Sequence, residues 1–151
     1  MIEKIISSGK PGAAVAALEV AVKLGLAYGG WCREGEPAPD KFRLDQLPDA
    51  SNRSVTEKAV EASHGSVYFT AGETASIRLE TTRKTALHLN KPLLIQDLDG
   101  ENGFSASRRI AVWIVENQIK VLHVDGEGEG HVVYSVATRY PKSLSRPFFS
   151  Q

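Results

Sequence analysis

The residues best suited to chemistry lie within the first dozen positions, where an apolar run ends in a turn. This turn contains Ser7, Ser8, Gly9, Lys10 and Gly12. A strand that leads into a helix through a glycine-containing turn collects free backbone N–H groups at the helix N-terminus, where the helix dipole favours an anion. The lysine adds a full positive charge beside these groups. The turn is therefore predicted to bind phosphate or another anion, the alternative being an ordinary turn whose serines cap the helix.

A second possible phosphate turn contains Thr70, Gly72 and Thr74. Thr74 lies near the start of a predicted helix, where backbone N–H groups favour an anion. Glu73 lies between the glycine and the threonine, and a carboxylate beside a phosphate is repulsive. The alternative is a capped helix start that binds no ligand.

Gly30, Trp31 and Cys32 open a segment rich in Gly, Pro, Asp and Arg. Trp31 could stack on a purine or pterin ring, a contact that contributes roughly 1–3 kcal/mol per base in nucleic-acid binders. The Cys32 thiolate could ligate a soft metal such as molybdenum. The alternative is that Trp31 anchors the segment to the core and that Cys32 is a small buried residue.

Metal binding and catalysis have less support in the sequence. Glu127 and Glu129 alternate with glycines and could hold a metal that bridges to phosphate, or could be solvated loop charges. No metal-ligand spacing relates the four histidines, which are interpreted as core or surface residues: His64, His88, His123 and His131. No nucleophile elbow of a Ser-His-Asp triad is recognisable. The sequence therefore predicts no metal site and no catalytic residue.

The elements that must position these residues follow from the alternation of short apolar runs with helical patterns. Strands are predicted at residues 2–6, 26–29, 66–70, 92–97 and 119–124. Helices are predicted at residues 11–24, 54–62, 74–89, 105–117 and 131–140. Residues 30–52 are interpreted as a long excursion, which is unusual inside a compact domain unless it is functional.

Strand–helix alternation indicates a parallel sheet covered by helices on both faces. We predict a single three-layer, Rossmann-like α/β domain over residues 1–151, with a mostly parallel sheet of about five strands in the order 2-1-3-4-5. Such sheets bind ligands outside the carboxyl ends of their strands, where the strand order reverses. Each turn expected at that edge contains glycine: 7–12, 29–35, 70–74, 97–103 and 125–130.

Composition narrows the range of partners. Eighteen basic and eighteen acidic side chains give a formal net charge of zero, which does not favour nucleic-acid binding. The single cysteine excludes an intrachain disulfide. The sequence contains no signal-peptide pattern and no apolar run long enough to span a bilayer, so we expect a cytoplasmic protein without a membrane partner.

Three motifs resemble those of the molybdenum-cofactor carrier family. IISSGKPG at residues 5–12, followed by AALE at 16–19, resembles the family opening IISGGQTGxDRAALD. GGWC at 29–32, with Gly35 three residues later, resembles GGWCPxG. GETA at 72–75 resembles GGTA. Further similarities follow in the expected order, so the resemblance extends over nearly the entire chain.

The resemblance implies a Rossmann-like fold related to the lysine-decarboxylase-like nucleotide-binding proteins. It also implies a carrier or storage protein for molybdopterin cofactor, a homo-oligomer, and a molybdoenzyme that accepts the cofactor. The chain departs from the family pattern in the motifs themselves. Ser8 and Lys10 replace glycine and glutamine, Ala14 and Val15 replace aspartate and arginine, and Glu73 replaces glycine.

The related phosphoribohydrolases provide a comparison for catalysis. Their motif PGGxGTxxE contains an essential glutamate, and Ile77 stands at that position here. That hydrolysis is therefore not expected, and the leading hypothesis is a noncatalytic binder of a phosphorylated heterocycle. The alternatives are an enzyme that acts on a nucleotide-like substrate through other residues, or a scaffold whose pocket no longer binds a ligand.

Overall fold

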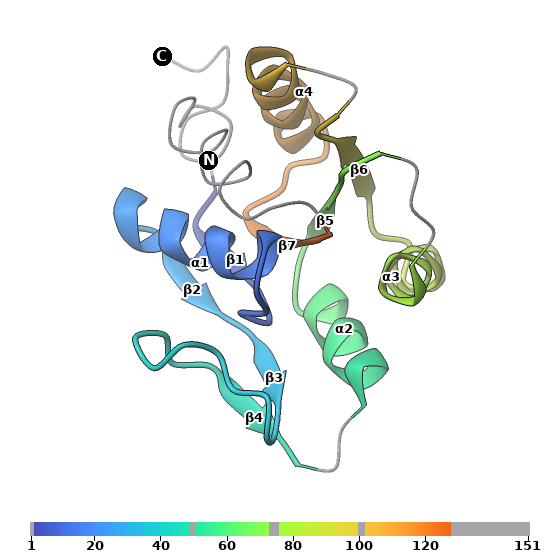
Figure 1. The fold of residues 1–151 in the computed structure, drawn as a ribbon. Helices are drawn as coiled ribbons and strands as arrows, with labels where there is room; N and C mark the ends of the chain where they lie inside the picture. The colour runs from blue at the N-terminus through green and yellow to red at the C-terminus, as the bar shows by residue number, and fades with distance from the viewer. Residues whose placement is uncertain (1, 49–50, 73–75, 100–101, 128–151) are drawn as a thin grey trace.

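Five parallel strands form the centre of the molecule (Figure 1). The structure is a computed structural model that describes residues 2–48, 51–72, 76–99 and 102–127. The strands are β1 (Lys4–Ile6), β2 (Ala27–Gly29), β5 (Gly65–Thr70), β6 (Leu93–Asp97) and β7 (Val121–Gly126). All neighbouring pairs in this sheet are parallel. The predicted α/β class, with a five-stranded parallel sheet, is confirmed.

The predicted strand order was wrong. The order is β2-β1-β7-β5-β6, so the last strand lies between the first strand and the strand after α2. Leu122 of β7 is the register partner of both Ile5 and Gly65. All but the first residue of β7 are buried, which suits a strand with a neighbour on either side. Counted from β7 as the first strand, the order becomes 3-2-1-4-5, as in Rossmann folds.

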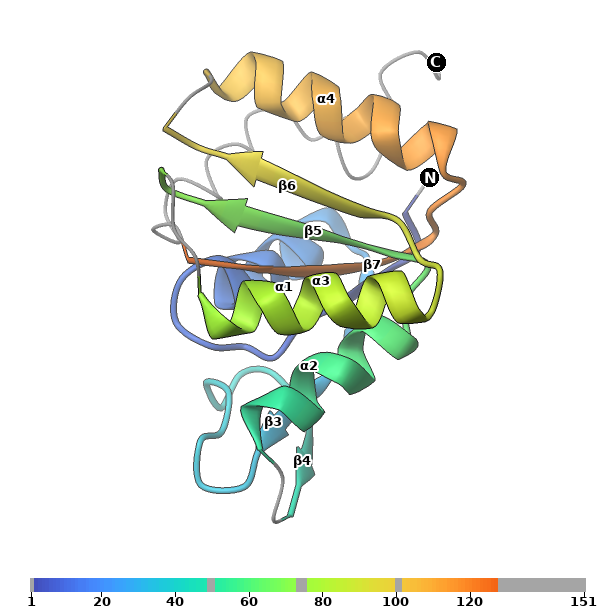
Figure 2. The ribbon, with the colours of Figure 1, turned by 90° about the vertical axis from the view of Figure 1, so that its right-hand side faces the viewer.

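Helices cover the sheet on both faces. α1 (Ala13–Leu24) and α4 (Gly103–Glu116) share one apolar cluster with β5 and β7, whereas α3 (Ile77–His88) packs on the opposite side. Figure 2 shows α3 in front of the sheet and α1 behind it. α2 (Asn52–Glu61) packs against α3. None of the helices in the described ranges combines the length and apolar composition required to cross a bilayer.

Local sequence explains where these helices begin and end. The left-handed Gly25 ends α1, as its sequence predicts. Ser51 and Ser76 cap α2 and α3 by accepting backbone N–H bonds. α2 and α4 each begin two residues before the expected positions, because Ser51 and Asn102 provide the caps. The helix expected at 131–140 lies outside the described residues.

The long excursion after β2 is folded. β3 (Trp31–Arg33) and β4 (Asp45–Leu47) form a separate two-stranded parallel sheet. The buried Phe42 ring meets Tyr28 edge to face, with 5.8 Å between the ring centroids. In Figure 1 this small sheet lies beside α2. The excursion thus forms a wall next to the carboxyl end of β1.

Candidate functional site

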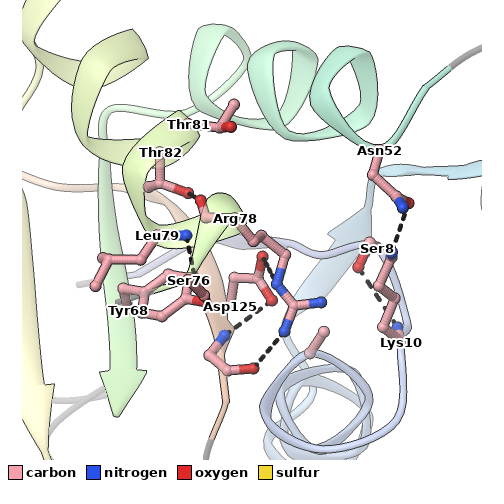
Figure 3. Close-up of polar contacts among 12 residues, drawn as sticks. Ser8, Lys10, Asn52, Tyr68, Ser76, Arg78, Leu79, Thr81, Thr82 and Asp125 are labelled. Atoms are coloured by element: carbon pink, nitrogen blue, oxygen red, sulfur yellow. Dashed lines mark hydrogen bonds and ion pairs between the residues drawn. The ribbon is translucent and has the colours of Figure 1, made fainter. Parts of the chain in front are cut away.

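The carboxyl ends of β1, β5 and β7 lie at one edge of the parallel sheet. In a 3-2-1-4-5 arrangement the strand order reverses between β7 and β5, where open α/β sheets bind ligands. Three segments converge there: the turn after β1, the end of β7 and the first turn of α3 (Figure 3).

The turn after β1 is fixed by its own serines. The Ser7 hydroxyl donates to the Ala14 carbonyl at 2.6 Å and accepts from the Gly9 N–H at 3.1 Å. The Ser8 hydroxyl accepts the Lys10 N–H at 3.4 Å. Among the residues that the structure describes, no side chain caps the N-terminus of α1. Both serines therefore hold the turn in shape, and two of its N–H groups already have partners inside it.

Glycine is required at position 9 because the excursion covers the turn. Gly9 has a φ of 71°, and a Cβ placed there would lie 2.6 Å from the Ala38 Cβ. Gly30, with a φ of 139°, approaches Ser7 so closely that a Cβ would lie 2.0 Å from the Ser7 carbonyl oxygen. Gly9 and Gly30 therefore have a packing role in this structure.

The Lys10 side chain extends from the turn toward α2. Its Nζ donates to the Asn52 Oδ1 at 2.6 Å and lies 3.9 Å from a Glu36 carboxylate oxygen. Partial burial lowers the pKa of Lys10, and the positive charge of Arg78 lowers it further. The positive charges of Lys10 and Arg78 thus repel each other. An anion bound between them would relieve this repulsion.

Arg78 is a site residue that the sequence did not reveal. From the first turn of α3 its Nη2 donates to the Gly126 carbonyl at 2.8 Å, and its Nε lies 3.3 Å from Asp125 Oδ2. The buried Nε has no hydrogen-bond partner among the described residues. Figure 3 shows the guanidinium between Asp125 and the side on which Lys10 lies. Arg78 is therefore tethered to β7 by the Nη2 hydrogen bond to Gly126 and by the ion pair of its buried Nε with Asp125.

Asp125 and Tyr68 form the buried polar base behind Arg78. Asp125 accepts the Gly126 N–H at 2.8 Å, and burial raises the pKa of its carboxyl although Arg78 lies beside it. Burial also raises the pKa of Tyr68, whose hydroxyl is 3.2 Å from the Ser76 hydroxyl. For Arg78, burial opposes the charged form, but Asp125 and Tyr68 outweigh it and raise the pKa. The guanidinium thus stays charged.

A cleft of about 240 Å³ lies between the turn after β1, α2 and the N-terminal part of α3. Its walls come from Lys10, Asn52, Arg53, Thr56, Ile77, Arg78 and Thr81. Three of these side chains are cationic, one is an amide and two are hydroxyls. A larger cleft of about 480 Å³ lies beside it, between α2 and α3, lined by Arg53, Ser76, Ile77, Glu80, Thr81, Lys84 and Thr85. The smaller cleft therefore has the chemistry of an anion site.

The other predicted site residues lie apart from this cleft. Trp31 contacts α2, where Lys58 Nζ lies 5.3 Å from the centre of its ring, and Trp31 lines neither cleft. The Gly72 N–H donates to Asp97 at 2.9 Å. Thr74 and the intervening Glu73 lie outside the described residues. Of the predicted site residues that the structure describes, only Lys10 places its side chain in the cleft wall.

The acidic and thiol groups form no metal centre in the described ranges. No cluster of three His, Cys, Asp or Glu residues could hold an ion there. The Cys32 sulfur is buried, 3.9 Å from the Asp45 carbonyl oxygen. Glu127 has one buried carboxylate oxygen without a hydrogen-bond partner among the described residues, and Glu129 lies outside them.

A sequence signal could have pointed to Asp125, but none indicates the role of Arg78. Asp125 directly follows the last predicted strand, and it would have been placed at the site if that strand had been recognised as central. Arg78 directly follows Ile77, at the position of the hydrolase glutamate. Its role depends on contact with β7, 48 residues away in the chain, which no local pattern indicates.

Comparison with known proteins agrees with this architecture. A solved structure described as "Putative molybdenum carrier protein" from Syntrophus aciditrophicus SB superposes with a TM-score of 0.85 and is 30% identical. The match covers 92% of this chain and 94% of that one. No curated protein sequence matches the chain.

The model of the circularly permutated YpsA SLOG family matches residues 5–141. A circular permutation accounts for the sheet, because moving β7 to the front of the chain yields the 3-2-1-4-5 order. The strand that would come first in an unpermuted Rossmann chain is here the last of the strands that the structure describes. The chain therefore belongs to the circularly permutated YpsA SLOG family.

Proposed function

We propose that this protein is a noncatalytic binder of a phosphorylated heterocycle and that its anionic group lies between Lys10 and Arg78. The observation that carries the proposal is the convergence of these two cations on one cleft at the carboxyl edge of the sheet. The lining contains no carboxylate, although Asp125 and Glu36 lie beside the two cations. A bound phosphate could accept hydrogen bonds from Lys10 Nζ and be attracted by the charge of the Arg78 guanidinium.

We propose molybdopterin cofactor as the ligand, because the motif resemblance implies it. The similar structure from Syntrophus aciditrophicus SB is described as a molybdenum carrier, and this supports a carrier role here. The chain's residues fit the phosphate end of such a cofactor, with Asn52 and Thr56 as further donors in the wall. Cys32 does not fit a role as molybdenum ligand, since its buried sulfur faces Asp45. The metal of the cofactor would therefore not be held by this thiol.

The carrier proposal includes partners. A carrier must release its ligand to an acceptor, which for this cofactor is a molybdoenzyme. We also propose that the chain forms a homo-oligomer, as the family resemblance suggests. Neither partner is needed for the binding test that follows.

Replacement of Lys10 by methionine tests the site directly. Methionine keeps the length of the side chain but removes the charge, so the affinity for AMP and for inorganic phosphate should fall roughly tenfold or more, as for a charged hydrogen bond. Titration calorimetry at fixed salt measures this change. Lys41→Met is the matched control, because Lys41 is exposed and pairs with Glu19 away from the cleft.

Thermal unfolding provides a second measurement. A ligand that binds only the native state stabilises it by about 2.7 kcal/mol at one hundred times its dissociation constant. AMP, isolated molybdopterin cofactor, molybdate and phosphate are the probes. The absence of any stabilisation by all four would contradict the proposal, as would equal affinities of the Lys10→Met variant and the unmodified protein.

Turnover is not expected at this site. Ile77 occupies the position of the hydrolase glutamate and is 88% exposed, so no carboxylic acid is available there to transfer a proton. Incubation with nucleoside monophosphates should therefore release no base, which chromatography of the products can check.

A further inference from the structure

Two adjoining clefts at the site, which together we call the groove, share part of their walls. The cleft of about 240 Å³ and its larger neighbour of about 480 Å³ share Arg53, Ile77 and Thr81 in their walls. The smaller volume lies below the usual range of roughly 300–1,000 Å³ for sites that hold drug-sized ligands, whereas the larger lies within it. A phosphate between Lys10 and Arg78 would use only the smaller cleft. The larger one has no role in the function proposed above.

Ile77 is the apolar residue among the three that line both clefts. Its side chain is 88% exposed in the first turn of α3, yet it contributes to both walls. An isolated exposed apolar residue on a helix is ordinary. Ile77 differs from such a residue because it lies in the wall of the smaller cleft, next to Arg78 in the chain.

The surface that extends from Ile77 along α3 is less polar than its residue types suggest. Thr81 donates its hydroxyl to the Ile77 carbonyl at 2.9 Å, and Thr85 donates to the Thr81 carbonyl at 2.7 Å. Because both hydroxyl hydrogens are donated to carbonyls of α3 itself, they are not available to a ligand. Spaced four residues apart, Ile77, Thr81 and Thr85 lie one above another on the same helix face. They form a stripe of methyl groups, which we call the α3 stripe.

We propose that the α3 stripe binds the organic body of the ligand and that Ile77 is the residue that selects a phosphate monoester with a ring over a bare oxyanion. The proposal rests on the proposed function, since the phosphate between Lys10 and Arg78 anchors one end. The body then extends over Ile77 into the larger cleft. Inorganic phosphate and molybdate would occupy the cation pair alone and gain nothing from the stripe.

The charge pattern of the groove matches such a ligand. Lys10 and Arg78 line the smaller cleft, and the apolar Ile77 follows directly. The larger cleft has two further cations in its wall, Lys84 and Arg53, of which Arg53 pairs with Glu57 at 2.7 Å. In the same wall Glu80 pairs with Arg83 at 3.2 Å, so its charge is compensated. The anionic end of a ligand therefore meets Lys10 and Arg78, and its organic body meets the α3 stripe, with the Arg53 and Lys84 side chains at the edges of the larger cleft.

Ile77→Ala tests the proposal, with AMP and inorganic phosphate as the two probes. The variant removes only methyl and methylene groups at an exposed position, so the fold should persist. The affinity for AMP should fall roughly tenfold, as expected when several apolar groups no longer lose water on binding, while the affinity for phosphate stays within about twofold. Leu87→Ala is the matched control, because Leu87 is 81% exposed on the same helix but lines neither cleft.

The outcomes separate this inference from the proposed function. If the unmodified protein binds neither probe, the proposed function fails. If it binds both, and Ile77→Ala weakens neither or weakens both equally, the α3 stripe is not the binding surface and the inference is overturned. A loss of AMP affinity in Trp31→Leu but not in Ile77→Ala would place the ring at Trp31 instead. A change in sedimentation of ligand-free Ile77→Ala, not matched by Leu87→Ala, would show an interface between copies and would also overturn it.

Discussion

Lys10 places a positive charge in the wall of the smaller cleft, which Arg78 also lines. Its position was predicted from the turn between an apolar run and an alanine-rich helix, because such turns follow from local patterns. Its neighbours were not predictable in the same way. Arg78 comes from α3 and Asn52 from α2, so the cleft depends on contacts between segments far apart in the chain. The hydroxyls of the two predicted serines are used inside the protein, since Ser7 bonds to Gly9 and to Ala14 in α1 and Ser8 bonds to Lys10.

The lowered pKa of Lys10 gives anion binding a defined pH dependence. Burial and Arg78 cause Lys10 to lose its proton at a lower pH than an ordinary lysine, whose pKa is 10.5. The affinity for AMP should therefore fall as the pH rises from 8 toward 10.5, a range in which the phosphate keeps a constant charge, since its second pKa is about 6. Titration calorimetry across this range measures the effect.

Lys10→Arg is the control for this alkaline loss. The guanidinium stays protonated throughout the range, so the affinity of this variant should be nearly independent of pH. An equal alkaline loss in the variant and the unmodified protein would mean that another group governs the pH dependence.

At the scale of elements, α2 is held at both ends. Its first residue, Asn52, contacts Lys10, and its C-terminal carbonyls are bound by Lys91. Lys91 Nζ donates to the carbonyl oxygens of Val60 at 3.2 Å and Ser63 at 2.7 Å, and also to that of Glu61. A cation at a helix C-terminus is favoured by the exposed carbonyls and by the helix dipole. This contact joins the segment before β6 to the helix that forms one wall of the groove.

Lys91→Met should therefore destabilise the protein by about 2 kcal/mol, since hydrogen bonds from a charged donor are lost and α2 keeps unsatisfied carbonyls. Urea unfolding followed by circular dichroism measures the free energy of unfolding. Lys120→Met serves as the control because Lys120 is exposed and directly precedes β7. If both variants lose the same stability, Lys91 does not act as a cap.

At the scale of the whole molecule, the circular permutation explains why the fold class was predictable and the strand order was not. Each strand and helix carries its own periodicity, so the alternation of the elements survives permutation. The neighbour of a strand does not follow from its rank in the chain. Residues 119–124 have the apolar run of a buried strand, but nothing local indicates that β7 pairs with both β1 and β5. The position of Asp125 at the site was missed for the same reason.

The central place of β7 also puts a histidine in the interior. His123 is buried, with Nδ1 2.9 Å from the Ser66 hydroxyl on the neighbouring strand. Burial, with a contribution from Arg78, lowers the pKa of His123 from 6.5 to about 4. Below pH 6.5 the unfolded chain therefore takes up a proton that the folded chain cannot. Stability should be fully present above pH 6.5 and should fall as the pH decreases toward 4, by up to about 1.4 kcal/mol per pH unit.

Urea unfolding between pH 7 and pH 4.5 tests this coupling, with the double variant Ser66→Ala/His123→Leu as the comparison. The double variant removes the titrating group together with its hydrogen-bond partner, so neither side chain is left unsatisfied. Asp125, whose pKa is raised, has the opposite effect on acid stability but is present in both proteins, and the difference between their slopes therefore isolates His123. His88→Gln, at the exposed end of α3, should keep the slope of the unmodified protein. Parallel slopes in the double variant and the unmodified protein would exclude His123 as the cause, and the acid sensitivity would then have to come from carboxylates outside the central strand.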